Sequence, residues 1–139
     1  HRAIGLSHSG WRGTVKRMGE KTVQALKDAY GTRPEDLICA IGPSICVDCY
    51  EVSQDTINEF RKNYSQSECE LIIQPENKPG KYLLNLLGAD YINLINAGVR
   101  PENIYLSDVC TSENSDILFS HRASSGKRGI MCNFIKIIN

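Results

Sequence analysis

The stretch HSGWRG, at positions 8–13, brings residue types that bind metals and anions together at one turn. The imidazole of His8 can serve as a metal ligand or a general base, and the guanidinium of Arg12 can bind an anion. Gly10 and Gly13 let the backbone approach a ligand closely. The alternative interpretation is structural: a tight turn with a packed tryptophan and a buried, hydrogen-bonded histidine.

A second stretch, IGPSICVDCYEV, carries Cys46, Cys49 and Tyr50 in a loop that a glycine–proline pair marks. The two cysteines form a C-x-x-C motif. The sequence has no second pair of this kind and no histidine at zinc-finger spacing, which argues against a structural zinc site. A redox pair would normally stand at the start of a helix after a strand. We therefore interpret the C-x-x-C motif as part of a plain loop.

The third stretch, CTSENSDILFSHRASSGKRG, begins at Cys110 and contains His121 and Arg122 beside a basic loop rich in serine and glycine. An imidazole and a guanidinium in such a loop are groups that can contact a polar or anionic substrate. A charged, solvated loop is the alternative interpretation, and the sequence letters leave both open.

Composition limits the class of protein. The 139 residues fit one domain, and 16 basic residues balance 16 acidic ones, whereas a nucleic-acid-binding protein would be expected to show a basic excess. No apolar run approaches the roughly 20 residues of a membrane span, and no signal peptide opens the chain. We therefore expect a soluble, cytoplasmic protein with no nucleic-acid and no membrane partner. In that compartment the six cysteines are expected to be reduced thiols.

The elements that must position these stretches follow from hydrophobic spacing and turn residues, which predict mixed helices and strands without a repeat or a domain linker. Gly31 and Gly98 stand where they would end two of the helices. The predicted strands span residues 3–6, 37–41, 71–73, 104–106 and 130–138, and the predicted helices span residues 14–30, 53–64 and 82–97.

The three stretches, in this order and with YLLNLLGADYINLINAGV between the last two, resemble the laccase-domain proteins, also called the multicopper polyphenol oxidase or YfiH-like family. The resemblance covers nearly the whole chain. It implies an α/β (α+β) fold of layered mixed β-sheets with outer helices, similar to the catalytic domain of the cytotoxic necrotizing factor toxins. Because family members are longer, residues 1–139 are expected to be a single laccase-domain fragment that lacks the family's N-terminal portion.

The resemblance also implies a metal site. The family's ligands are a His-Cys-His set that usually holds zinc, with copper also proposed, and the histidine of H-x-G-W-R-G falls on His8. The other two ligands lie upstream in the family, the cysteine in an A-D-C motif, and are not in this sequence. A catalytic zinc usually needs three protein ligands and an open position, so this chain is expected to be inactive without them.

Two activities are associated with the family. A three-ligand His/Cys site suits a zinc ion that activates water or orients a nucleoside, whereas four-electron reduction of dioxygen needs several coppers and more than the three histidines present. We therefore predict a zinc-dependent phosphorylase of purine nucleosides (adenosine, inosine, guanosine and methylthioadenosine) that uses phosphate and also deaminates adenosine. The alternatives are a copper-dependent polyphenol oxidase, an amidase acting on a misbuilt cell-wall precursor, and a non-catalytic fragment.

Site residues are assigned through the same resemblance. Catalysis is assigned to His8 and Arg12, and substrate binding to Arg12, Tyr50, His121 and Arg122. His121 departs from the family pattern, in which a tyrosine precedes the arginine, but it keeps a hydrogen-bonding ring. Asn85 stands where many relatives have an aspartate, so no catalytic role is assigned there. Arg12 has a structural alternative, in which it braces the turn by pairing with a carboxylate such as that of Glu51.

Overall fold

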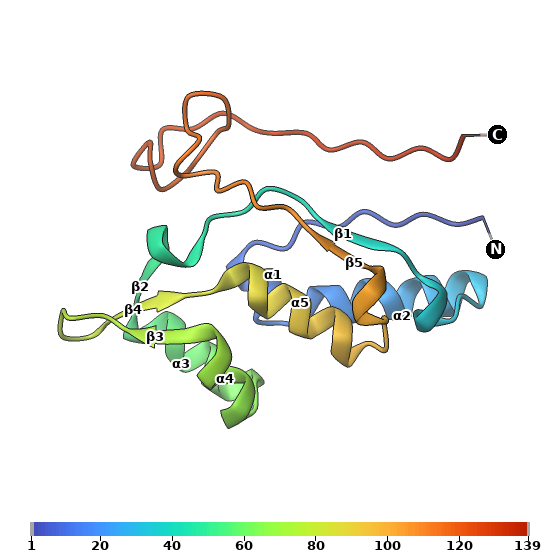
Figure 1. Cartoon of the computed structure of the whole chain (residues 1–139), viewed down its shortest axis with the longest axis horizontal. Coiled ribbons are helices and arrows are strands. Elements are labelled where there is room, and N and C mark those ends of the chain that lie inside the picture. Colours follow the sequence, from blue (N-terminus) through green and yellow to red (C-terminus); the bar gives the residue numbers. More distant parts are fainter. Residues whose placement is uncertain (1, 139) are drawn as a thin grey trace.

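The computed structural model describes residues 2–138, and Figure 1 shows their helices and strands. The helices are α1 (Trp11–Thr14), α2 (Met18–Tyr30), α3 (Gln54–Asn63), α4 (Gln66–Ile72) and α5 (Leu86–Asn96). The strands are β1 (Cys39–Ile41), β2 (Glu51–Ser53), β3 (Ile73–Pro75), β4 (Lys81–Leu84) and β5 (Ile104–Leu106). Three short 3-10 turns are η1 (Pro34–Asp36), η2 (Val47–Cys49) and η3 (Pro101–Asn103).

The strands form one parallel pair and one antiparallel sheet. β1 and β5 pair in parallel with Cys39 opposite Ile104, and an isolated parallel bridge between Ser44 and Cys110 continues the same direction. β2, β4 and β3 form the antiparallel sheet, in which Val52 lies opposite Tyr82. The α2 and α5 helices lie next to the β1–β5 pair, and α3 and α4 lie beside the antiparallel sheet (Figure 1). The predicted α/β (α+β) class with mixed sheets is confirmed.

Buried apolar side chains form two clusters. The larger joins the antiparallel sheet to α3, α4 and α5, and its most completely buried members are Ile57, Phe60, Ile72, Leu84 and Ala89. The smaller joins α2 to the parallel pair through Val23, Val99 and Ile104. Full burial of a side chain of this size contributes about 1.5–3 kcal/mol. The larger cluster therefore holds the antiparallel sheet to α3, α4 and α5, and the smaller holds the parallel pair to α2.

The single helix predicted for residues 14–30 is wrong at its start. α1 ends at Thr14, Arg17 has a left-handed backbone with φ of 60°, and α2 begins at Met18. A left-handed conformation is costly for a residue with a side chain, so contacts elsewhere must compensate for it. The predicted end is confirmed, because Gly31 caps α2 with φ of 64°.

Two other predictions assigned the wrong element type at one end. Residues 71–73 are not simply a strand, since α4 continues to Ile72 and β3 begins only at Ile73. The helix predicted from residue 82 begins at Leu86, after β4. The side chain of Asn85 accepts a hydrogen bond of 2.8 Å from the Gly88 N–H and so fixes the helix start. The leucine-rich run suits both periodicities, so the pairing of β4 with β2 and β3 and the Asn85 cap, rather than the spacing, separate strand from helix.

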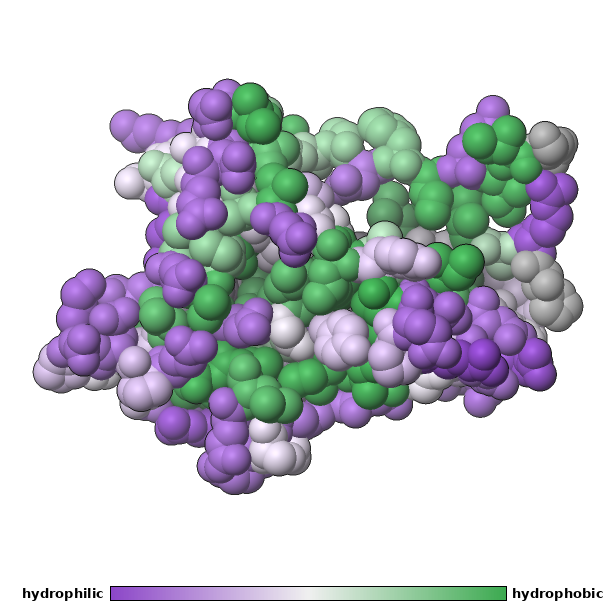
Figure 2. Space-filling model, viewed as in Figure 1, coloured by the Kyte–Doolittle hydropathy of each residue, from purple (hydrophilic) through white to green (hydrophobic). Residues whose placement is uncertain are grey.

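The segments predicted as strands at 3–6 and 130–138 are extended but belong to neither sheet of the described chain (Figure 1). Arg2 donates a hydrogen bond of 2.7 Å to the Ile138 carbonyl, so the two segments lie side by side. Apolar residues on them are exposed, Phe134 to 92%, and Figure 2 shows hydrophobic side chains gathered on this part of the face. A strand needs a partner for its backbone groups, and these segments have too few. No helix among the described residues is long and apolar enough to cross a membrane.

Candidate functional site

His8 lies in the extended segment just before α1, and its side chain is exposed. A Cβ added at Gly10 would come within 2.9 Å of the His8 Nε2, so the imidazole folds over the glycine backbone. Glycine is therefore needed at position 10 for the ring to take this place. In the described chain the imidazole is therefore exposed rather than buried, and it is accessible to a ligand. Its role as a ligand stays a prediction.

Asp90 of α5 anchors the turn that carries His8. The Ser9 hydroxyl donates a hydrogen bond of 2.6 Å to the Asp90 carboxylate, which is only 7% exposed. Burial raises the pKa of Asp90 to about 6, although hydrogen bonds from Ser9 and Thr14 and the nearby His8 act in the opposite direction. A carboxyl buried beside the turn therefore holds HSGWRG against α5.

The structure brings together residues from all three stretches around the ring of Tyr50. The Arg122 guanidinium lies over this ring, 5.3 Å from its centroid, and Arg12 stacks on Trp11 at 4.4 Å. Burial raises the pKa of Tyr50, and the positive charges of Arg122 and Arg12 oppose the rise, which places both guanidinium groups within electrostatic reach of the phenol. The phenol of Tyr50 thus has the Arg122 guanidinium over its ring and also experiences the positive charge of Arg12.

His121 and Glu51 form contacts with residues outside the group around Tyr50. The backbone of His121 accepts a hydrogen bond of 2.9 Å from the Gly126 N–H, and its ring lies over that glycine, 3.6 Å from where a Cβ would stand. Glu51 forms ion pairs with Lys78 at 2.8 Å and Lys81 at 3.3 Å. Its carboxylate is thus paired with two lysines of the described chain rather than with Arg12.

A cluster of thiols, which the sequence did not reveal, lies beside Tyr50. One ligand atom from each of Cys46, Cys49, Cys110 and Glu113 lies within 4.8 Å of the others, so these residues could hold a metal ion. The C-x-x-C motif was the only local signal. Its completion depends on Cys110 and Glu113, which the Ser44–Cys110 bridge brings alongside.

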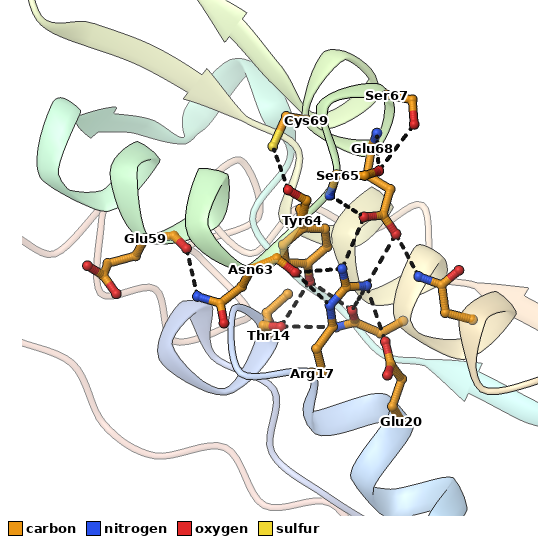
Figure 3. Close-up of polar contacts among 12 residues, drawn as sticks. Thr14, Arg17, Glu20, Glu59, Asn63, Tyr64, Ser65, Ser67, Glu68 and Cys69 are labelled. Atoms are coloured by element: carbon orange, nitrogen blue, oxygen red, sulfur yellow. Dashed lines mark hydrogen bonds and ion pairs between the residues drawn. The ribbon is translucent and has the colours of Figure 1, made fainter.

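A second group missed at the sequence level fixes the α1–α2 junction (Figure 3). Arg17 donates to Glu68 at 3.0 Å and stacks on the ring of Tyr64 at 3.8 Å. The Tyr64 hydroxyl lies 2.8 Å from the Asn93 side-chain oxygen and 2.9 Å from the Thr14 carbonyl. These contacts compensate for the left-handed backbone at Arg17 and hold the end of α1, and so the HSGWRG turn, against α4 and α5.

Comparison with known proteins adds to this geometry. The profile of the family described as multi-copper polyphenol oxidoreductase laccase matches residues 1–138. The chain is 35% identical over 132 residues to the purine nucleoside phosphorylase YlmD of Geobacillus stearothermophilus, covering 95% of this chain and 47% of that protein. It is 33% identical over 119 residues to the adenosine deaminase RL5 of an unknown prokaryotic organism, covering 86% of this chain and 44% of that protein.

The fold agrees with a solved structure. The crystal structure of YlmD from Geobacillus stearothermophilus superposes with a TM-score of 0.79 at 34% identity, covering 89% of this chain and 45% of that chain. The present chain therefore spans about half the length of the relatives it matches.

Proposed function

Because the chain belongs to the multi-copper polyphenol oxidoreductase laccase family, we propose that it forms part of a cytoplasmic, zinc-dependent purine nucleoside phosphorylase that also deaminates adenosine. The proposed substrates are adenosine, inosine, guanosine and methylthioadenosine together with phosphate. The names of relatives, purine nucleoside phosphorylase and adenosine deaminase, support a purine-processing enzyme.

The observation that carries the proposal is the Arg122 guanidinium over the ring of Tyr50, with the positive charge of Arg12 acting on the same phenol. A guanidinium binds two phosphate oxygens with parallel hydrogen bonds, and two guanidinium groups match the charge of a phosphate dianion. An aromatic ring at their side offers a stacking surface for a purine. We assign phosphate to Arg12 and Arg122 and the nucleoside to Tyr50, with His121 contacting the nucleoside from the neighbouring loop.

His8 is proposed as the one zinc ligand that this chain contributes to the catalytic metal. Its exposed imidazole on a glycine-flanked turn fits that role. A zinc ion bound there would activate a water molecule or orient the nucleoside. One imidazole does not hold a catalytic zinc, so the upstream histidine and cysteine that the resemblance implies are required. Ser9 and Asp90 position the turn behind the imidazole.

The family name favours a second candidate, oxidation of phenols by copper. That reaction needs several coppers, and the three histidines of this chain are few for such a set. The amidase alternative has no specific observation in its favour.

The test runs three assays on the complete gene product. Inosine and phosphate are assayed for hypoxanthine and ribose 1-phosphate, adenosine without phosphate for ammonia, and a phenol for oxygen consumption. We expect base release that depends on phosphate, ammonia release from adenosine without phosphate, and no oxygen consumption. Phenol oxidation with several coppers per chain, and no phosphate-dependent base release, would overturn the proposal.

A further inference from the structure

We infer that Cys46, Cys49, Cys110 and Glu113 bind a structural zinc ion, separate from the metal assigned to His8. This zinc would join the loop before Tyr50 to the loop after β5. The inference does not depend on the proposed activity, because it rests on the donor set alone.

The distances fit a tetrahedral site. In zinc sites the metal lies about 2.3 Å from sulfur and about 2.0–2.2 Å from a carboxylate oxygen, which separates the donors by roughly 3.5–3.8 Å. The Glu113 Oε1 lies 3.7 Å from the Cys46 Sγ and 3.9 Å from the Cys49 Sγ. All four donor atoms lie within 4.8 Å of one another, so a shift of less than about 1 Å in the thiols completes the site.

The backbone places the donors without help from a metal. Cys46 caps the η2 turn and Cys49 ends it, which puts two thiols on one side of a single turn. Cys110 is held opposite by the bridge to Ser44, in which the Ser44 N–H donates to the Val109 carbonyl at 3.3 Å. The donors are therefore prearranged, as a site of useful affinity requires.

The donor types, together with a backbone hydrogen bond to one of the thiols, favour zinc. The Cys46 N–H donates to the Cys110 Sγ at 3.3 Å, and this hydrogen bond stabilises negative charge on the sulfur. Cys110 is 4% exposed, Cys46 and Cys49 are half-buried, and Glu113 is exposed to solvent. Three soft sulfur donors select zinc over magnesium or calcium, which prefer oxygen.

The place of the proposed zinc site, between the loop before Tyr50 and the loop before Arg122, gives it a structural role. Tyr50 comes directly after Cys49, and Arg122 reaches its ring from the loop that follows Glu113. A metal that clamps the two loops would hold the Tyr50–Arg122 pair in place.

The test uses the complete gene product, stripped of metal under reducing conditions and titrated with cobalt(II), whose thiolate charge-transfer absorption reports cysteine ligands. The His8→Ala variant is used as background, so the metal assigned to His8 does not contribute. Cys49→Ser and Cys110→Ser remove ligands, whereas Cys132→Ser, exposed and outside the cluster, is the matched control.

We expect one cobalt per chain with thiolate absorption in the His8→Ala background and in its Cys132→Ser derivative. We expect at least about a 100-fold loss of affinity in Cys49→Ser and Cys110→Ser. As a readout that needs no cysteine variant, zinc-edge X-ray absorption of the His8→Ala protein should show three sulfur neighbours at about 2.3 Å. Unchanged cobalt absorption in Cys49→Ser, no sulfur neighbours at the zinc edge, or a Cys46–Cys49 disulfide in zinc-free protein from zinc-supplied cells would overturn the inference.

Discussion

The guanidinium of Arg17 and the carboxylate of Glu68 meet at 3.0 Å and tie the start of α2 to the first turn of α4. Both side chains are largely shielded, with 20% and 18% of their surfaces exposed. The hydrogen bond from Arg17, with further donors from Ser65 and Asn96, lowers the pKa of Glu68 to about 2 despite partial burial. The pair thus couples the position of the HSGWRG turn to the charge of Glu68.

This pair predicts loss of stability in acid. The folded-state pKa of Glu68 lies below the unfolded value of about 4.3, so its stabilisation is present above about pH 4.5 and is lost as the pH falls toward 2. Such a shift corresponds to roughly 3 kcal/mol, and because solvent screens the partly exposed carboxylate we expect about 1–2 kcal/mol, measured by urea unfolding across this range. Glu68→Gln should make the decline shallower. Glu59→Gln, which alters an exposed pair with Lys62, should not, and equal slopes for both variants would contradict the prediction.

The buried hydroxyl of Tyr64 gives a second prediction. Tyr64→Phe removes one hydroxyl donor that the Asn93 side-chain oxygen and the Thr14 carbonyl share, so the free energy of unfolding should fall by about 1–2 kcal/mol. Chemical denaturation measures this loss. Tyr30→Phe is the control, because Tyr30 is 52% exposed, and its effect should stay within about 0.5 kcal/mol. A Tyr64→Phe protein as stable as the control would show that the network is not stabilising.

Alanine substitutions at two glycines distinguish the cost of backbone strain from the cost of adding a methyl group in open space. Gly98 has φ of 91°, and an added Cβ would lie 3.3 Å from the Pro34 Cβ, so Gly98→Ala should cost about 1–3 kcal/mol. Gly42 has open space at the Cβ position, and Gly42→Ala should change stability by no more than about 0.5 kcal/mol. Thermal unfolding of both variants tests the difference, and similar melting temperatures would refute it.

The proposed role of Arg12 is tested by a change in geometry at constant charge. Arg12→Lys replaces a planar, two-pronged donor with a point charge, so the KM for phosphate should rise by about tenfold while metal content stays constant. Steady-state kinetics at varied phosphate measure this, with Arg100→Lys, an exposed arginine before η3, as control. Unchanged phosphate dependence with a lower melting temperature would identify Arg12 as a structural brace.

His8 and His121 should differ in their effect on metal. His8→Ala should lower metal content by one equivalent per chain and abolish phosphorolysis while the fold survives, because the side chain is exposed. His121→Ala should raise the KM for nucleoside and leave metal content unchanged. Elemental analysis and circular dichroism measure both effects. Full activity and full metal content in His8→Ala would refute its assignment as a ligand.

Local sequence determined much of this protein. Helix 53–64 appears as α3, strand 104–106 appears as β5, and Gly31 ends α2 as predicted. Each depends on interactions within a few residues: hydrophobic spacing, which selects helix or strand, and the freedom of glycine to take a left-handed conformation. The motifs also identified the family, which the match to residues 1–138 confirms.

Tertiary structure decided what depends on distant partners. The break at Arg17 exists because Glu68, Tyr64 and Asn93 lie around its guanidinium, and no local pattern encodes that meeting. The segments 3–6 and 130–138 have strand-like sequences but lack a paired edge in the described chain, so local preference alone does not make them strands.

The thiol cluster also depends partly on local sequence and partly on tertiary structure. Cys46 and Cys49 are visible as a motif, but Cys110 lies 64 residues from Cys46 and comes near only through the Ser44–Cys110 bridge. The spacing of residues in the sequence determines which side chains of one turn lie on the same side of it. Which remote loop faces that turn is fixed by the pairing of strands and by the packing of the cores beneath them, since these set the positions of both loops.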